Sequence, residues 1–225
     1  SIIKKGGVKV AVLGYTNADN ASLMDGSCVS GIRFESLLPL VQEDVDKVRS
    51  KEKPQVVVVV AHTSMGKGDG RNLEKQGLDL FKSLRGVDVV IAGHDHSNKV
   101  MSADSIVVLD CGRAGQYAGV TDIKLVVKGG KVASRTLDAK MASIKSEEYD
   151  SAMEKAFESD YDKVHSFMTS TVGEIKKDLV SREFYYRQCD YMNFLHALAF
   201  SAYPVDISLS ATLLIDGKVP AGEVR

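Results

Sequence analysis

The sequence has no excess of charge of either sign, because 29 lysines and arginines are balanced by 30 aspartates and glutamates. It therefore gives no indication of a nucleic acid or an anionic membrane as partner. No apolar run approaches the ~20 residues that a membrane-spanning helix needs. The longest run, VVVVVA at 56–61, has the length of a strand. Only three cysteines are present, spread along the chain at Cys28, Cys111 and Cys189, and we expect free, buried thiols rather than a disulfide framework.

Three valine-rich segments, at 8–16, 56–63 and 87–94, are almost continuously apolar. Strands that are covered on both faces have this pattern, whereas half-exposed strands alternate between apolar and polar residues. Between these segments, apolar residues recur at helical spacing over 37–48 and less regularly over 73–84. The order strand, helix, strand, helix, strand predicts an α/β fold whose parallel strands are joined by crossover helices.

The pattern changes after residue 100. A strand is predicted at 105–111, and a hairpin at 119–137 turns at Gly129–Gly130. The segment 145–168 is highly charged with a thin apolar stripe, which is typical of a helix that links or caps domains. The remaining predicted elements are a strand in TSTVGEIKKDLV (169–180), an amphipathic helix in YMNFLHALAFSA (191–202) and a strand in VDISLSATLLI (205–215).

Three of the five histidines follow the ends of predicted parallel strands. His62 ends the strand at 56–61, and His94 and His96 lie in IAGHDH, directly after the next strand. Ligands bind beyond the carboxyl ends of parallel strands, so we expect these three side chains at one edge of the sheet. A single histidine is more often structural than functional. Three together favour a metal site, since neutral imidazole is the commonest metal ligand among side chains.

The other candidate features are weaker. The glycine-rich segment GKGDGRN (66–72) lies between a strand and a helix, where backbone amides can hold phosphates, but it fits neither of the two common nucleotide-binding spacings. We interpret it as a flexible loop beside the metal site, with a nucleotide-cofactor loop as the alternative. Asp69 either orients a histidine or metal-bound water, or is a simple turn residue. His165 is expected to be solvated and His196 to lie at the edge of a core.

Three stretches, AHTSMGKGD, IAGHDH and LDCGRAGQYAGVTDIKL, resemble in order and spacing the metallophosphatase domain of 5′-nucleotidases and 2′,3′-cyclic-nucleotide phosphodiesterases. TVGEIKKDLVSRE and VDISLSATLLIDGKVPAGEV resemble the start of that family's C-terminal substrate domain. The resemblance implies an α/β fold: part of a four-layer α/β/β/α metallophosphatase sandwich at 1–142, a linking helix at 143–168, and a truncated, smaller α/β domain at 169–225.

The resemblance also implies roles for particular residues. His62 and His94 match ligands of one metal ion of a dinuclear centre, and His96 matches a ligand of the other. The two divalent ions would be Zn, Mn, Fe or Co, whose ligand preferences overlap. Arg182 and Arg187 lie near the positions of phosphate-contacting arginines, although solvated surface arginines have the same pattern. The implied reaction is attack of a metal-bound hydroxide on a small phosphate ester, a nucleotide rather than a nucleic acid duplex, in the periplasm or at the cell surface.

The family's Asp-x-His, bridging aspartate and Gly-Asn-His-Glu segments do not occur in this sequence. They supply the remaining metal ligands and the catalytic residues, so we expect none of the catalytic dyad in this chain. Three imidazoles without a bridging carboxylate do not balance the charge of two ions. We therefore expect an interior fragment of a phosphoesterase that is inactive alone. The alternative is a non-catalytic relative that binds a ligand or partner, which the divergent stretch SATLLID motivates.

Overall fold

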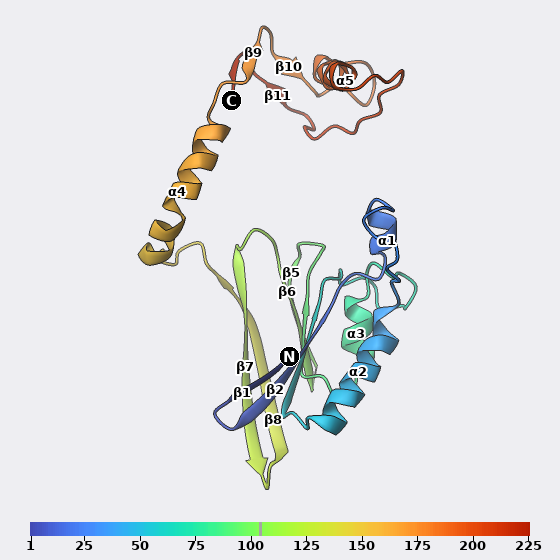
Figure 1. Cartoon of the computed structure of the whole chain (residues 1–225), viewed down its shortest axis with the longest axis vertical. Coiled ribbons are helices and arrows are strands. Elements are labelled where there is room, and N and C mark those ends of the chain that lie inside the picture. Colours follow the sequence, from blue (N-terminus) through green and yellow to red (C-terminus); the bar gives the residue numbers. More distant parts are fainter. Residues whose placement is uncertain (104) are drawn as a thin grey trace. The chain divides into compact units, whose positions relative to one another are not determined.

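The structure is a computed structural model that describes residues 1–103 and 105–225. The chain divides into two compact units, Ser1–Glu147 and Glu148–Arg225, which are described separately (Figure 1). The helices of the first unit are α1 (Asn20–Leu23), α2 (Leu37–Lys51) and α3 (Gly77–Ser83). Its strands are β1 (Ile2–Lys5), β2 (Val8–Tyr15), β3 (Val56–Ala61), β4 (Val89–Ala92), β5 (Asn98–Ala103), β6 (Ile106–Cys111), β7 (Tyr117–Lys128) and β8 (Lys131–Ser143).

Six strands of the first unit form one mixed sheet in the order β1-β2-β3-β4-β6-β5. β2, β3, β4 and β6 are parallel, whereas β1 and β5 pair antiparallel at the two edges. The predicted parallel arrangement with crossover helices is therefore confirmed. The predicted hairpin is also present, since β7 pairs with β8 around Gly129 and Gly130, both with positive φ.

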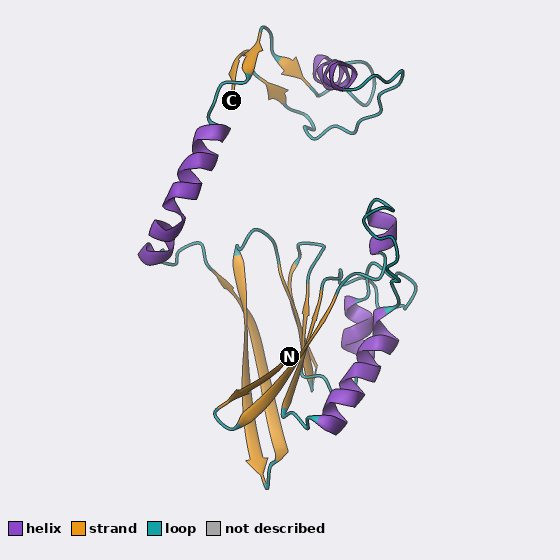
Figure 2. Ribbon diagram, viewed as in Figure 1, coloured by secondary structure: helices purple, strands orange, loops and turns teal. Residues whose placement is uncertain are grey.

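Successive side chains of a strand point to opposite faces of the sheet, so the apolar residues form two cores, one on each face. Val57 and Val59 of β3 and Val108 of β6 pack with α2 and α3, whereas Val107 and Leu109 of β6 face the β7–β8 hairpin. Figure 2 shows the helices on one face of the sheet and the hairpin on the other. The first unit thus has α/β/β layers.

The prediction that these strands are covered on both faces is only partly correct. All of β6 up to Asp110 is buried, but Val60 of β3 and Ile91 of β4 are 38% and 36% exposed. Both lie on the face opposite the helices, toward the carboxyl ends of their strands. The hairpin covers this face where it packs on β5 and β6 and leaves these two side chains accessible.

The helices agree with the sequence pattern to different degrees. α2 is as predicted and buries Leu37, Val41 and Val45. α3 begins at Gly77 rather than near Leu73, because the segment before it forms a hydrogen-bonded turn: Glu74 N–H donates to Asn72 Oδ1 at 3.0 Å. None of the helices in the described residues is long and apolar enough to span a membrane, as predicted.

The second unit is small and is held by a core of Leu179, Cys189 and Tyr191. Its elements are α4 (Ser151–Met168), β9 (Gly173–Ile175), β10 (Leu179–Val180), α5 (Asp190–Ala202), β11 (Lys218–Val219) and β12 (Gly222–Val224). β10 pairs with β11 and β9 with β12.

The strand predicted in VDISLSATLLI is wrong, since residues 205–215 are irregular. A strand requires a hydrogen-bonded neighbour, and here β10 pairs with β11 instead. Leu209 and Leu213 are consequently 94% and 93% exposed. The three cysteines are free, as predicted, but only Cys189 is buried and Cys28 is exposed.

Helix α4 depends on local interactions, because none of its residues is buried. Asp150 caps it, its Oδ1 accepting the N–H groups of Ala152 and Met153 at 3.0 and 3.1 Å. We expect Asp150→Ala to destabilise the helix by about 1 kcal/mol, seen as faster hydrogen exchange in its first turn. Asp150→Ser should retain most of the protection. Unchanged exchange in Asp150→Ala would show that the cap does not stabilise α4.

Candidate metal site

The parallel strands end at one edge of the sheet, where His62 and His94 meet. His62 follows β3, and its N–H donates to the carbonyl of Tyr15 at the end of β2. Gly93 follows β4, and its N–H donates to the carbonyl of Thr63 at 3.3 Å. These bonds extend the sheet beyond its last regular pairs and hold His62 and His94 on neighbouring strand ends.

The imidazoles of His62 and His94 face each other. His94 Nδ1 lies 3.2 Å from His62 Nε2, and the rings meet edge to face with centroids 5.1 Å apart. Two nitrogens bound tetrahedrally to one ion at about 2.0–2.1 Å lie roughly 3.3–3.4 Å apart. The observed separation therefore fits two ligands of one metal ion. It also allows an N–H···N hydrogen bond between neutral rings, which would hold the pair in place without an ion.

The backbone of GHDH is strained at both histidines. His94 has a φ of +91° and His96 a φ of +55°, a region that residues other than glycine seldom adopt. Such conformations cost about 1–3 kcal/mol each and concentrate at functional sites. The turn thus holds two imidazoles at a strand end at the expense of stability.

Glu74 completes the surroundings of His94, since its Oε1 lies 2.9 Å from His94 Nε2. Thr63, fully buried next to His62, holds Glu74 in place through a 2.8 Å hydrogen bond from its hydroxyl to the Glu74 carbonyl. A carboxylate on the second nitrogen of a ligating histidine fixes its tautomer and increases its basicity. The sequence pattern gave no signal for Glu74, because its contact depends on the path of an irregular loop.

A pair of carboxyl groups lies behind the GHDH turn. Asp110, fully buried at the end of β6, accepts the Ser97 hydroxyl at 2.7 Å and shares a hydrogen bond with Asp95. Burial, and then this bond, raise the pKa of Asp110. Burial acts to raise the pKa of Asp95 also, but hydrogen bonds from Asp110, the Met65 amide and Ser97 outweigh it and lower that pKa. Asp95 thus holds the turn against the backbone of Met65.

Asn17, two residues beyond β2, was not singled out by the sequence pattern. It is fully buried, and its Oδ1 accepts the Asp19 N–H at 2.8 Å. Among the described residues, its Nδ2 is the one buried side-chain nitrogen or oxygen without a hydrogen-bond partner. An unpaired buried donor costs about 1–3 kcal/mol, so this end of β2 is also held at a cost in stability.

The residues present form only part of a metal site. His62 and His94 are together, with Glu74 attached to His94, whereas His96 is exposed on the same turn. Over residues 1–103 and 105–225, no group of three or more His, Cys, Asp or Glu side chains is arranged to hold an ion. The donor set fits two ligands of one ion and offers no bridging carboxylate for a second.

The arginines predicted to bind substrate lie in the second unit and are exposed. Arg182 pairs with Asp216, and Arg187 Nε donates to Glu183 at 2.6 Å. These ion pairs raise the pKa of both guanidinium groups. Each arginine would have to exchange a carboxylate for a phosphate in order to bind substrate.

The remaining histidines have ordinary surroundings. His165 is exposed on α4 and stacks on Tyr161, with ring centroids 5.7 Å apart. His196 Nδ1 lies 2.9 Å from the Ser208 hydroxyl and is partly buried. Both observations agree with the predicted solvated and core-edge positions.

The glycine-rich segment packs closely against the backbone that follows it, at Gly66 but not at Gly70. A Cβ on Gly66 would lie 2.1 Å from the Lys75 carbonyl oxygen, whereas a Cβ on Gly70 would meet nothing within 4 Å; both residues have a φ of +69°. Asp69 accepts the Arg71 N–H, so it is a turn residue and does not orient a histidine.

We expect Gly66→Ala to lower the free energy of unfolding by roughly 2–4 kcal/mol, because backbone strain is added to a clash with main chain. Gly70→Ala shares the strain without the clash and should cost about 1 kcal/mol. Denaturant unfolding of both variants provides the comparison. Equal losses would mean that the Lys75 carbonyl moves away easily.

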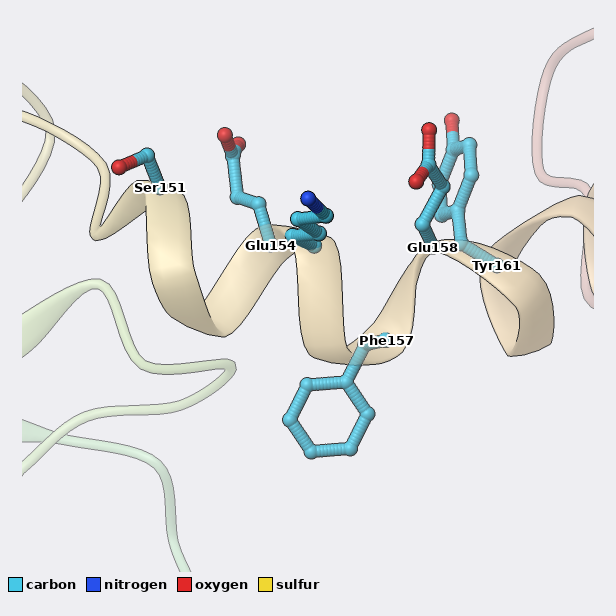
Figure 3. Close-up of a pocket in the computed structure, with 6 residues that line it drawn as sticks. Ser151, Glu154, Phe157, Glu158 and Tyr161 are labelled. Atoms are coloured by element: carbon cyan, nitrogen blue, oxygen red, sulfur yellow. The ribbon is translucent and has the colours of Figure 1, made fainter.

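A surface hollow of about 610 Å³ lies along α4 in the second unit. All its lining residues belong to this one helix, and Phe157 points to the opposite side from Glu154, Glu158 and Tyr161 (Figure 3). A hollow lined by a single exposed helix does not enclose a ligand, so we do not assign a site there.

No protein-family model matches this chain. In sequence, it is 29% identical over 128 residues to the trifunctional nucleotide phosphoesterase YfkN of Bacillus subtilis, covering 55% of this chain and 8% of that protein. It is 24% identical over 109 residues to a 5′-nucleotidase of Vibrio cholerae, covering 47% of this chain and 20% of the relative. The chain is distantly related to 5′-nucleotidases and phosphoesterases.

Solved structures agree in fold. A putative 5′-nucleotidase from Staphylococcus aureus superposes with a TM-score of 0.69 at 15% identity, covering 90% of this chain and 41% of that one. Calcineurin-like phosphoesterase YfkN from B. subtilis gives a TM-score of 0.63 at 20% identity, covering 74% and 57% respectively. The mixed sheet and its helices therefore have a metallophosphoesterase-type arrangement. In each comparison the chain spans less than two thirds of the length of its relative.

Proposed function

We propose that this chain is part of a dinuclear-metal phosphoesterase that hydrolyses small phosphate esters, nucleotides among them. The observation that carries the proposal is the 3.2 Å approach of His62 Nε2 and His94 Nδ1 at the carboxyl edge of the sheet. Sequence similarity to YfkN and to 5′-nucleotidases supports it, since those proteins are named for this chemistry. A periplasmic or cell-surface location is proposed with it.

In this proposal, His62 and His94 hold one divalent ion and His96 contributes to a second. The chemistry such a centre would supply is activation of a water molecule and neutralisation of phosphoryl charge. Glu74 keeps the proton of His94 on Nε2, so that Nδ1 presents a lone pair beside His62. Asp95 and Asp110 keep the turn that carries His94 and His96 fixed to the sheet.

We further propose that residues 1–142 are part of a four-layer metallophosphatase sandwich, 143–168 a linking helix and 169–225 the beginning of a substrate domain. Val60 and Ile91, exposed on the sheet face opposite the helices, are positions that further strands of the second β layer would cover. Arg182 and Arg187 would then contact the substrate phosphate after releasing Asp216 and Glu183.

Cobalt titration with a phosphate-release assay tests the proposal. The chain should bind Co²⁺ with an absorption spectrum that AMP perturbs, and it should release no phosphate from AMP or 2′,3′-cyclic AMP over many hours. Absence of Co²⁺ binding would refute the metal centre and favour a ligand- or partner-binding module, which needs no ion. Sustained turnover would refute the expected inactivity, because it would require ligands beyond the histidine pair.

A further inference from the structure

A small basic pocket lies in the loop between β3 and α3. Its volume is about 360 Å³, and it is lined by Gly66, Lys67, Asp69, Arg71, Asn72 and Lys75. The segment begins four residues after His62, and the residue before Lys75 is Glu74, whose carboxylate contacts His94. The pocket is therefore connected through the chain to the histidine pair, although it shares no residue with it.

The charge of this pocket is net positive. Lys67, Arg71 and Lys75 form no ion pair within the part of the chain that the structure describes. The one acidic lining residue, Asp69, accepts the Arg71 N–H. Three cations against one carboxylate leave a net positive pocket in a chain whose total charge is −1. All three side chains are exposed, and their positive potential attracts anions.

The backbone of the loop is built to keep this shape. Gly66, Gly68 and Gly70 all have a φ of +69°, which glycine adopts without steric cost. Lys82 Nζ lies 3.3 Å from the Lys67 carbonyl, and the buried Asp79 accepts the Gly70 N–H at 2.9 Å. The three cations are thus presented by a fixed loop.

We infer that this pocket binds a phosphate group. A compact tetrahedral anion can accept hydrogen bonds from Lys67, Arg71 and Lys75 together, and Arg favours phosphate through its planar fork of donors. Nucleic acid is a poorer fit, because it requires a basic track longer than one loop. If the proposed function holds, the substrate carries a second anionic group here, as a nucleoside diphosphate or pyrophosphate ester does, while the scissile phosphate lies at the histidines.

Titration of the metal-free chain with inorganic phosphate and pyrophosphate, followed by ¹⁵N NMR and calorimetry, tests the pocket directly. The amides of 66–75 should shift, and pyrophosphate should bind more tightly than phosphate. Arg71→Gln and Lys75→Gln should each weaken binding about tenfold. Lys51→Gln, an exposed lysine of α2, is the matched control and should bind normally. Unshifted loop amides, or equal affinity in all variants, would overturn the inference.

Two further comparisons separate this inference from the proposed function. His62→Ala should abolish Co²⁺ binding and leave phosphate binding in the loop intact; loss of both would mean that the loop is not a site of its own. With Co²⁺ present, Arg71→Gln should weaken ADP about tenfold and AMP little. Equal weakening of both nucleotides would overturn the second-anion assignment. A wild-type chain that binds pyrophosphate but no Co²⁺ would refute the proposed function alone.

Discussion

Replacing Asp88 by alanine is expected to lower the free energy of unfolding of the first unit by about 3–5 kcal/mol. Asp88 is fully buried immediately before β4, and its two carboxylate oxygens bind different layers. Oδ2 accepts Arg49 Nη2 of α2 at 2.9 Å and the Val57 N–H of β3 at 2.7 Å. Oδ1 accepts Arg135 of β8. One side chain thus ties the helices, the sheet and the hairpin together.

The size of this effect follows from what remains after the substitution. Arg49 and Arg135 are half-buried, and burial lowers the pKa of both, with the charge of Arg49 adding to the effect on Arg135. Without Asp88, two close positive charges and the Val57 N–H lose their acceptor. Breaking a buried ion pair in this way costs more than the pair itself contributes, because an uncompensated charge is left behind.

Denaturant unfolding of Asp88→Ala, Asp88→Asn and Arg135→Ala gives the measurement. Asp88→Asn preserves the shape and should still lose about 2–4 kcal/mol, since the charge is removed. Arg135→Ala should cost less, about 1–2 kcal/mol, because Asp88 keeps Arg49 and Val57. If Asp88→Ala does not fold, the stability of Asp88→Asn is measured instead. A loss below 1 kcal/mol in Asp88→Asn would show that water replaces the carboxylate.

The same residues show what the sequence pattern could reveal about the fold. The valine-rich strands and α2 were predictable, because burial imposes a period on neighbouring residues. The pairing of Asp88 with Arg135 was not, since it joins residues 47 positions apart through the packing of two layers. VDISLSATLLI has the composition of a strand but is irregular in the structure. A strand needs a hydrogen-bonding neighbour, which composition cannot reveal.

The candidate site could be predicted in part, because histidines directly after predicted strands indicate where side chains meet. His62 and His94 could be expected to meet because parallel strands end at one edge, and the structure brings them together. Glu74 and the lysines of the 66–75 loop were not predicted, because an irregular loop has no period from which positions can be inferred. Whether His96 and the two arginines contribute to a site stays a prediction.

His94→Ala is expected to lower the affinity of the chain for Co²⁺ or Zn²⁺ by at least about 100-fold. Loss of an outer partner of a ligating histidine costs about 10–100-fold, and His94 is proposed to be a ligand itself. Glu74→Gln, which keeps a hydrogen-bonding group beside His94 Nε2 but removes the charge, should cost about tenfold. His165→Ala, on exposed α4, is the matched control and should bind normally.

His94→Gly separates the ligand role from backbone strain. Glycine adopts a φ of +91° without the steric cost that histidine has at this position. We therefore expect His94→Gly to unfold at no lower denaturant concentration than the natural chain while binding metal as weakly as His94→Ala. Wild-type affinity in both variants would remove His94 from the site. A large loss of stability in His94→Gly would instead show that its contacts with His62 and Glu74 hold the fold, and that the strained turn is a structural feature and not one maintained for metal.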